Sequence, residues 1–286
     1  MPLLGTIAGN SVRGFGLTSG PLPDYSLAAT IVSSGQTWTV PAGARRIAVF
    51  LIGGGGAGST GNGSSYRVSG AGGAGGGGSP GIAFKDYGVN PGDSFNVSAG
   101  SAGSPSTFAS LANSGYGQNS SFVNGTCSVS GFVSASGTTG ANGGSSRGST
   151  GNGLTGGSSV SANSMTLYLG PTLGNVTRSA GISGPGGGGG ALSLGTSTTT
   201  FSGGVAGTGT GGKLAGAGGT ARASTPSATN GAAATTSSTI YGAGGAGGGG
   251  AGYAENTSTS IFDDSAVGGA GNSGTQGIVY IYTSNT

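Results

Sequence analysis

The chain has 286 residues, of which 72 are Gly and only 5% are charged, and its formal net charge is +3. Histidine is absent and Cys127 is the single cysteine, which excludes His-based acid–base catalysis, a Ser-His-Asp triad and an intrachain disulfide. The nine basic residues are scattered, which gives nucleic-acid binding little support. A hydrophobic content of 33% with so little charge favours a packed chain over a disordered one.

The N-terminal stretch differs from the rest of the chain. Residues 1–27 space apolar residues with Gly and Ser and contain Pro21 and Pro23, so we predict an extended arm that docks on another protein; a frayed terminus is the alternative. No basic region precedes an apolar run, so we expect no Sec signal peptide, and no apolar run is long enough for a transmembrane helix. A soluble virion component, made in the host cytoplasm and released by lysis, fits these features.

Residues 28–286 are expected to form one glycine-rich domain. Its first strands are predicted at 28–33 and 36–40, where apolar and polar residues alternate before a Pro-Ala-Gly turn. The strongest strand signal is RRIAVFLI at 45–52, whose nearly continuous apolar run indicates burial on both faces. This strand leads directly into four consecutive glycines at 53–56.

Two identical stretches, GAGGAGGGG at 70–78 and 242–250, repeat with a period of three. An α-helix has a period of 3.6 and a strand a period of 2, whereas polyproline II geometry has three residues per turn. Glycine in this geometry keeps its N–H donor and, without a Cβ, lets neighbours approach closely. The motif alone also fits a flexible linker, but a buried strand that feeds a glycine block favours packed polyglycine helices. Shorter blocks occur at 184–190, 216–219 and 268–271.

Further strands are predicted between the glycine blocks, at 82–87, 94–98 and 164–169, with short ones near 122–123 and 127–133. A Pro-Gly-Asp turn at 91–93 indicates a hairpin. Residues 137–158 and 191–239 offer little to pack. The last strand, 277–282, is β-branched and aromatic, and we expect it to pair with 45–52 and close the domain. The predicted fold class is all-β: antiparallel β-strands combined with packed polyglycine II helices, without a sizeable α-helix.

Motifs that resemble catalytic or cofactor sites are weak in this chain. Patterns of the G-x-G-x-x-G type arise by chance at this glycine content. In the nearest match to a phosphate loop, residues 207–214, Leu214 stands where Ser or Thr would bind Mg²⁺. The pair Asp263-Asp264 near Glu255 favours a solvated loop over a glycosidase pair or a Ca²⁺ site, because neighbouring strand residues point to opposite faces. We therefore expect no enzyme activity, no cofactor and no metal.

Aromatic residues fall in the predicted loops between glycine blocks. Loops of Tyr, Ser, Asn and Gly have the composition of adaptable binding surfaces, and aromatic faces suit sugar rings. The alternative is that each Tyr caps a glycine helix by packing on bare backbone. The residues in question are Tyr66, Tyr116, Tyr168, Tyr253 and Phe262.

Three stretches resemble phage tail-fibre proteins. TWTVPAG at 37–43, followed by IAVFLI at 47–52 and the glycine block at 53–58, is similar to the entry into their glycine-rich domains. GGAGNSG at 268–274, leading into 277–282, is similar to the exit. The segment 3–16 is similar to N-terminal segments of phage virion fibre proteins. In T-even-type distal fibre adhesins, which this pattern resembles, polyglycine II helices pack into a sandwich and the loops between them contact the host surface.

The resemblance implies a tail-fibre adhesin whose loops 59–69, 191–215 and 253–267 face the receptor. The candidate contact residues are Tyr66, Arg67, Tyr253, Phe262 and Asp263. The expected partners are other virion or tail proteins bound through the N-terminal arm, a host surface glycan or outer-membrane protein, and further copies of the chain, with a trimer favoured. Nucleic acid and a membrane span are not expected. Two alternatives stay open. One is a structural fibre or decoration protein without its own receptor. The other is an ice-binding bundle in which the alanines at every third position of the two repeats, the alanine column, form a flat face.

Overall fold

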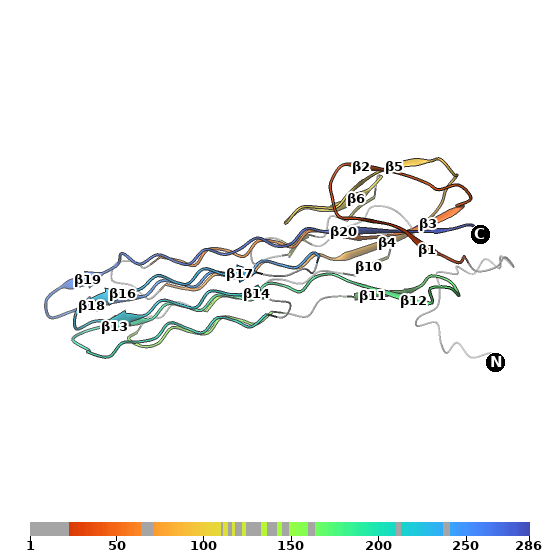
Figure 1. Ribbon diagram of the computed structural model, residues 1–286. Coiled ribbons are helices and arrows are strands. Elements are labelled where there is room, and N and C mark those ends of the chain that lie inside the picture. Colours follow the sequence, from red (N-terminus) through yellow and green to blue (C-terminus); the bar gives the residue numbers. More distant parts are fainter. Residues whose placement is uncertain are drawn as a thin grey trace, which may run out of the picture.

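The computed structural model describes residues 23–63, 71–109, 111–113, 116–117, 122–123, 133–135, 142–144, 149–159, 164–209, 213–236 and 241–286. Figure 1 shows an elongated molecule in three parts. We call them the base, where the longer β-strands lie, the shaft, made of extended glycine-rich segments, and the tip, where short strands gather at the opposite end.

The base is organised around a five-stranded antiparallel sheet in the order β1-β20-β3-β4-β10. The predicted pairing of strands 45–52 and 277–282 is confirmed, since Ile278 lies opposite Ile52 and Ser284 opposite Arg46. β1 spans the boundary that the sequence placed between the arm and the domain. The strands are β1 (Ser26–Ile31), β3 (Arg46–Ile52), β4 (Ile82–Gly88), β10 (Val133–Ala135) and β20 (Ile278–Ser284).

Both faces of this sheet are covered, which explains the continuous apolar run of β3. On one face Val49 and Leu51 pack against a second sheet in the order β2-β5-β6-β7. On the other face Phe50 and Ile52 pack against the β11–β12 hairpin. These elements are β2 (Gln36–Thr39), β5 (Ser94–Ser98), β6 (Ser106–Phe108), β7 (Leu111–Asn113), β11 (Ser164–Tyr168) and β12 (Asn175–Ser179).

The hairpin predicted between 82–87 and 94–98 is wrong, although both strands are present. β4 pairs with β3, and β5 pairs with β2 in the other sheet. The turn itself exists: Gly92 has a φ of 89°, and its N–H donates to the carbonyl of Val40 at 3.0 Å. The Pro-Gly-Asp sequence thus predicts that the chain reverses, but it does not predict which strands pair. Each strand joins the sheet against which its apolar side chains can pack.

The shaft consists of segments whose hydrogen-bond partners recur every third residue. In segment 242–252, the N–H groups at 245, 248 and 251 donate to segment 53–62, and those at 244, 247 and 250 donate to segment 181–191. The N–H groups at 249 and 252 donate to segment 229–234. Three columns of donors that face three neighbours require three residues per turn, which is the polyproline II geometry that the period of three predicts.

Segment 242–252 occupies the centre of a hexagon. Besides the three segments that accept its N–H groups, three more donate to its carbonyls, namely 71–78, 214–220 and 266–276. Segment 181–191 is surrounded in the same way. Among the described residues the bonds define a middle layer of 266–276, 242–252, 181–191 and 151–159, flanked by one layer of 53–62, 71–78 and 142–144 and another of 229–234, 214–220 and 202–208.

Close packing explains the glycine content of the shaft. A Cβ added to Gly184, Gly187 or Gly247 would lie 1.8, 2.0 or 2.2 Å from a main-chain oxygen of a neighbouring segment, which no side chain tolerates. Two alanines of segment 242–252 lie where side chains replace a main-chain acceptor: the N–H of Ala243 donates to Thr275 Oγ1 at 2.7 Å, and that of Ala246 donates to Asn272 Oδ1 at 2.8 Å.

The alanine column therefore does not form a surface. Ala71, Ala74, Ala243 and Ala246 are at most 7% exposed, which removes the flat alanine face expected of an ice-binding bundle. The regions 137–158 and 191–239 also differ from the prediction, because they supply the shaft segments 151–159, 202–208, 214–220 and 229–234. Their Ser and Thr residues do not interrupt the bundle, since a segment on the outside needs glycine only in the columns that face inward.

The described residues contain β-strands and no α-helix, so the predicted fold class is confirmed. The described part of the chain contains no helix that is long and apolar enough to cross a membrane. The remaining short strands are β8 (Tyr116–Gly117), β9 (Phe122–Val123), β13 (Leu192–Leu194), β14 (Lys213–Leu214), β15 (Ala221–Arg222), β16 (Ser227–Ala228), β17 (Thr235–Thr236), β18 (Tyr253–Asn256) and β19 (Ile261–Asp263).

Candidate functional site at the tip

The tip is a direct continuation of the two central shaft segments. Segment 181–191 runs on into β13, and segment 242–252 runs on into β18. These two strands pair in parallel, with Leu192 opposite Tyr253, and β19 adds to β18 in the antiparallel sense. The small hairpin of β15 and β16 lies beside them (Figure 1). The most tightly held part of the shaft thereby positions the surface at its end.

Tyr253 supports this sheet from within. Its side chain is fully buried, and its hydroxyl donates to Glu255 Oε2 at 3.1 Å. This corrects the placement of Tyr253 on a receptor-facing surface. Its burial fits the alternative reading of the loop tyrosines, in which the ring packs at the end of a glycine helix.

Three apolar side chains are exposed at the tip. Ile261 is 57% exposed and Phe262 is 40% exposed, both on the outer strand β19, and Val267 is 57% exposed at the start of segment 266–276, where this segment leaves the tip. The sequence predicted Phe262 as a contact residue but missed Ile261 and Val267. The signal for Ile261 was present, because Ile-Phe is the only pair of adjacent large apolar residues within the polar stretch 253–267.

Asp263 fixes β19 to its neighbours. Its Oδ2 accepts from the N–H of Ala228 at 2.8 Å, and its Oδ1 accepts from the hydroxyl of Ser265 at 2.7 Å and the N–H of Ser265 at 3.1 Å. Partial burial opposes ionisation, but the hydrogen bonds from Ser265 and Ala228 together hold the pKa of Asp263 below its usual value. Its carboxylate is therefore engaged inside the tip, although the sequence grouped it with the receptor contacts.

Hydrogen bonds also join the loops of the tip to one another. Asn256 Nδ2 donates to the carbonyl of Ser224 at 3.2 Å, and Ser224 N–H donates to the carbonyl of Ser197 at 2.8 Å. Arg222 Nε donates to Ser224 Oγ at 3.1 Å. Three loops from distant parts of the sequence are thus held together, which keeps the surface in one arrangement before any partner arrives.

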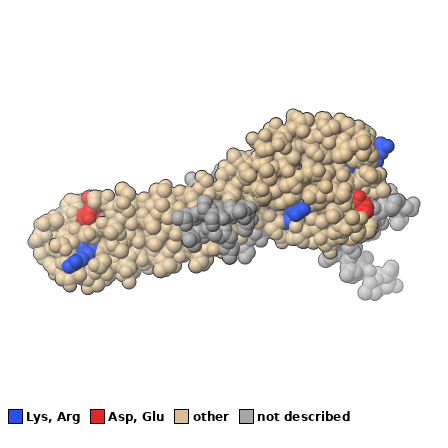
Figure 2. All heavy atoms as spheres, in the orientation of Figure 1, with Lys and Arg blue, Asp and Glu red and all other residues tan. Residues whose placement is uncertain are grey.

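In the part of the chain that the structure describes, charge is concentrated at the two ends of the molecule. Among its described residues the tip carries Arg222 against the carboxylates of Glu255, Asp263 and Asp264, so this part of it is acidic although the whole chain is basic. Where Figure 2 draws the shaft in tan, no blue or red atoms are visible between the charged ends. Lys213 of β14 is the exception among the described shaft residues.

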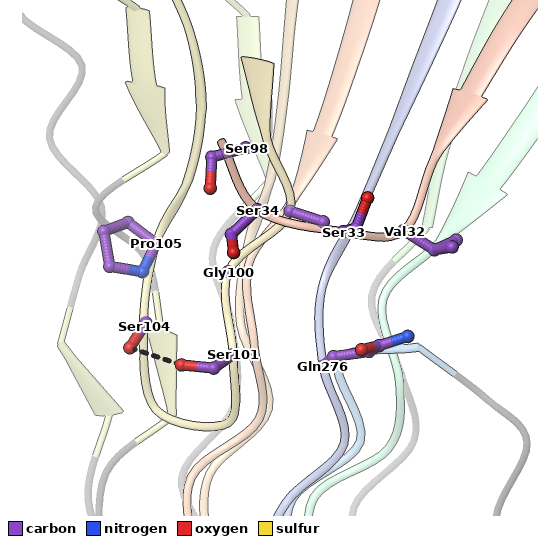
Figure 3. A pocket seen from close by; sticks show the side chains of 10 residues that line it. Val32, Ser33, Ser34, Ser98, Gly100, Ser101, Ser104, Pro105 and Gln276 are labelled. Atoms are coloured by element: carbon purple, nitrogen blue, oxygen red, sulfur yellow. Dashed lines mark hydrogen bonds between the residues drawn. The ribbon is translucent and has the colours of Figure 1, made fainter. Parts of the chain in front are cut away.

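A concave site lies where the base meets the shaft. This cleft has a volume of about 400 Å³ and a neutral lining rich in hydroxyl groups (Figure 3). Ser101 Oγ donates to Ser104 Oγ at 3.1 Å across one wall. The lining contains no acid, base or cation that could drive a reaction. It consists of Val32, Ser33, Ser34, Ser98, Ala99, Gly100, Ser101, Ser104, Pro105 and Gln276.

The predicted contact loops are only partly loops. Residues 59–62 and 202–208 belong to the shaft, whereas 192–197 and 253–267 lie at the tip as expected. Tyr66 and Arg67 lie outside the described residues. No group of three His, Cys, Asp or Glu side chains that could hold a metal forms in the part of the chain that the structure describes.

The fold and the tip together define a glycine-rich scaffold that carries a preorganised surface at one end. The chain belongs to the glycine-rich domain family, whose sequence profile matches residues 30–284. No curated protein matches the chain at a significant level.

Proposed function

We propose that the protein is a phage tail-fibre adhesin that binds the host cell surface through its tip. The observation that supports this most is that the two ends of the rod differ. The first and last described strands pair in the base, while the exposed apolar side chains of Ile261, Phe262 and Val267 gather at the opposite end beside an excess of carboxylates. The resemblance to tail-fibre proteins in segments 37–58 and 268–282 points the same way.

The shaft suits this role because it presents a surface without flexibility. Binding loses affinity when loops must be ordered on contact, at about 0.5–1.5 kcal/mol for each immobilised side chain. Here the tip loops are already bonded to one another and to strands that continue the two central segments. Exposed apolar groups rimmed by polar residues are typical of interaction sites, and a receptor could cover them.

In this proposal the N-terminal arm, residues 1–27, attaches the protein to other tail proteins, and the chain acts in the virion. The receptor is a glycan or a protein of the host surface. Assembly as a homo-oligomer, with a trimer favoured, would place several tips side by side and raise the overall avidity.

Binding to intact cells tests the proposal. Fluorescently labelled protein is incubated with a panel of bacterial strains, and bound label is measured by flow cytometry. The tip variant carries Ile261→Ser, Phe262→Ser and Val267→Ser. The control variant carries Leu154→Ser and Val205→Ser, which replace apolar side chains that are 42% and 68% exposed on the shaft.

We expect the tip variant to bind at least about tenfold more weakly, since central apolar anchors each contribute more than about 1 kcal/mol, and the shaft variant to bind like the wild type. Thermal unfolding of both variants verifies that they are folded. Equal binding by the tip variant would contradict the role of the tip. Binding to no strain at all would favour the alternative of a structural fibre or decoration protein.

A further inference from the structure

The described part of the chain contains four Asn-Gly dipeptides, at Asn62, Asn142, Asn152 and Asn230. An asparagine followed by glycine is the sequence most prone to lose its side-chain amide, because the next residue has no Cβ to hinder attack by its main-chain nitrogen. The four sites have the same two residues, so a difference in their reactivity must come from the fold.

Two of the four sites are clamped by a neighbouring segment. Asn152 Oδ1 accepts from the N–H of Ser202 at 2.9 Å, and the N–H of Gly153 donates to the carbonyl of the same Ser202 at 2.9 Å. Both the amide that would be attacked and the nitrogen that would attack are therefore held by Ser202. They point toward the neighbouring segment rather than toward each other.

Asn230 repeats this arrangement. Its Oδ1 accepts from the N–H of Val267 at 2.9 Å, and the N–H of Gly231 donates to the carbonyl of Val267 at 2.9 Å. The same clamp thus occurs at two places in the bundle, each time between parallel segments.

Asn62 lacks the clamp. Its main chain is anchored, because its N–H donates to Gly72 at 3.1 Å and its carbonyl accepts from Ala251 at 3.0 Å. Its side chain and the N–H of Gly63 have no hydrogen-bond partner among the described residues, and both residues are exposed. A Cβ added to Gly63 would meet only the carbonyl oxygen of Ala266, at 3.8 Å, so the reacting groups have room to rotate.

Asn142 is the intermediate case. Its side chain is exposed and has no partner among the described residues, but Gly143 is crowded: an added Cβ would lie 1.9 Å from the carbonyl oxygen of Gly73. The backbone at this site therefore has less freedom to bring the nitrogen toward the side chain than the backbone at Asn62.

We propose that Asn62 is a site of spontaneous deamidation, and that the fold protects Asn152 and Asn230. The main-chain nitrogen of Gly63 gives up its proton to hydroxide and attacks Cγ of Asn62. A C–N bond forms, the side-chain nitrogen leaves as ammonia, and a succinimide ring results. Water then opens the ring at either carbonyl to give aspartate or isoaspartate. The net reaction consumes one water, releases one ammonia and adds one negative charge.

The modification would act on the tip. Asn62 ends segment 53–62, and its carbonyl accepts from Ala251, two residues before Tyr253 enters β18. An aspartate product keeps this carbonyl in the main chain. In an isoaspartate product the main chain runs through the former side chain, and the original carbonyl becomes part of a side-chain carboxylate. The hydrogen bond from Ala251 to the main chain of residue 62 is then lost. In both products the acidic tip gains a further negative charge.

Peptide mapping by mass spectrometry tests the proposal without knowledge of any ligand. The full-length protein is incubated in mildly alkaline buffer, once folded and once in denaturant, and the amide-to-acid conversion of each dipeptide is followed with time. In the folded protein we expect Asn62 to convert about 30-fold faster than Asn152 and Asn230. That factor corresponds to about 2 kcal/mol, the net contribution of two hydrogen bonds at about 1 kcal/mol each. In denaturant the rates should agree within a few-fold.

A variant of the clamp provides the matched control. Ser202→Pro removes the N–H that holds Asn152 Oδ1, and polyproline II geometry accommodates proline. We expect it to accelerate conversion at Asn152 severalfold and to leave Asn230 unchanged. The proposal is overturned if the folded wild-type protein converts Asn62 no faster than Asn152 and Asn230. It is also overturned if the same difference persists in denaturant, because the sequence rather than the fold would then set the rates.

Discussion

Replacement of Gly247 by alanine tests the packing of the shaft at its centre. In segment 242–252 the added Cβ would lie 2.2 Å from the carbonyl oxygen of Ala74 and 2.8 Å from that of Gly75, where ordinary contacts begin near 3.4 Å. Neither obstacle is a flexible side chain. Segment 71–78 therefore has to retreat by about 1 Å from segment 242–252, which opens a contact that is packed as closely as a crystal.

The magnitude follows from the bonds that this retreat strains. Segment 71–78 donates to segment 242–252 from Ala71 at 3.1 Å, from Ala74 at 2.9 Å and from Gly77 at 2.7 Å. A displacement of about 1 Å takes such bonds beyond useful length, and each contributes about 0.5–1.5 kcal/mol. Overpacking adds about 1–3 kcal/mol. We expect Gly247→Ala to lower the free energy of unfolding by about 3–6 kcal/mol, and Tm by about 10 °C or more.

Gly88→Ala is the matched control. Gly88 ends β4, and a Cβ added there would meet no heavy atom within 4 Å. Because alanine restricts the unfolded chain, we expect this substitution to be neutral or to stabilise the protein by up to about 1 kcal/mol. Urea unfolding followed by circular dichroism gives both values. If Gly247→Ala and Gly88→Ala agree within about 0.5 kcal/mol, the inference of close main-chain packing around segment 242–252 is refuted.

Two further predictions concern single side chains. Arg178 on β12 lies with its Cζ 3.9 Å from the ring centroid of Tyr280, and its Nε donates to the hydroxyl of Tyr282 at 2.9 Å; Arg178→Met should destabilise the base by about 1–2 kcal/mol in urea unfolding, and an unchanged midpoint would contradict this. The pKa of Asp263 is lowered in the fold, so its contribution to stability is present above its usual pKa near 3.8 and disappears as the pH falls through the lower folded value. The Tm difference between wild type and Asp263→Asn should therefore be largest near neutral pH and shrink in acid; a difference independent of pH would count against the assigned role.

The parts of the fold that follow from local patterns were predictable. The run 45–52 has enough consecutive apolar residues to indicate burial on both faces, and the period of three at 70–78 and 242–250 indicates three residues per turn. The outer segments of the shaft were not predictable. In segment 202–208, for example, only the two columns that face inward need glycine, at Gly203 and at Gly204 and Gly207, so the remaining Ser, Val and Thr make it look like a loop.

The tip shows the same limit for single residues. Tyr253 and Phe262 both occur in a polar stretch, and composition does not separate them. Their difference arises from pairing between distant segments: Tyr253 lies on β18, between β13 and β19, whereas Phe262 lies on the outer strand. The burial of a side chain in this sheet thus depends on residue 192, some 60 positions away in the chain, and no local pattern reports that contact.

The Ser, Thr and Asn residues that separate the glycine blocks have a physical role of their own. A polyglycine bundle has no natural boundary, because each outer segment presents N–H groups on which another chain could assemble, as at the edge of a β-sheet. Here side chains satisfy such groups on peripheral segments: Asn152 accepts from the N–H of Ser202, and Asn230 accepts from the N–H of Val267. An N–H group that already has a side-chain acceptor offers no bond to a further segment. The polar spacers thereby limit the lateral growth of the lattice that the glycines build, and the shaft can remain a discrete rod although its interior has the packing of a fibre.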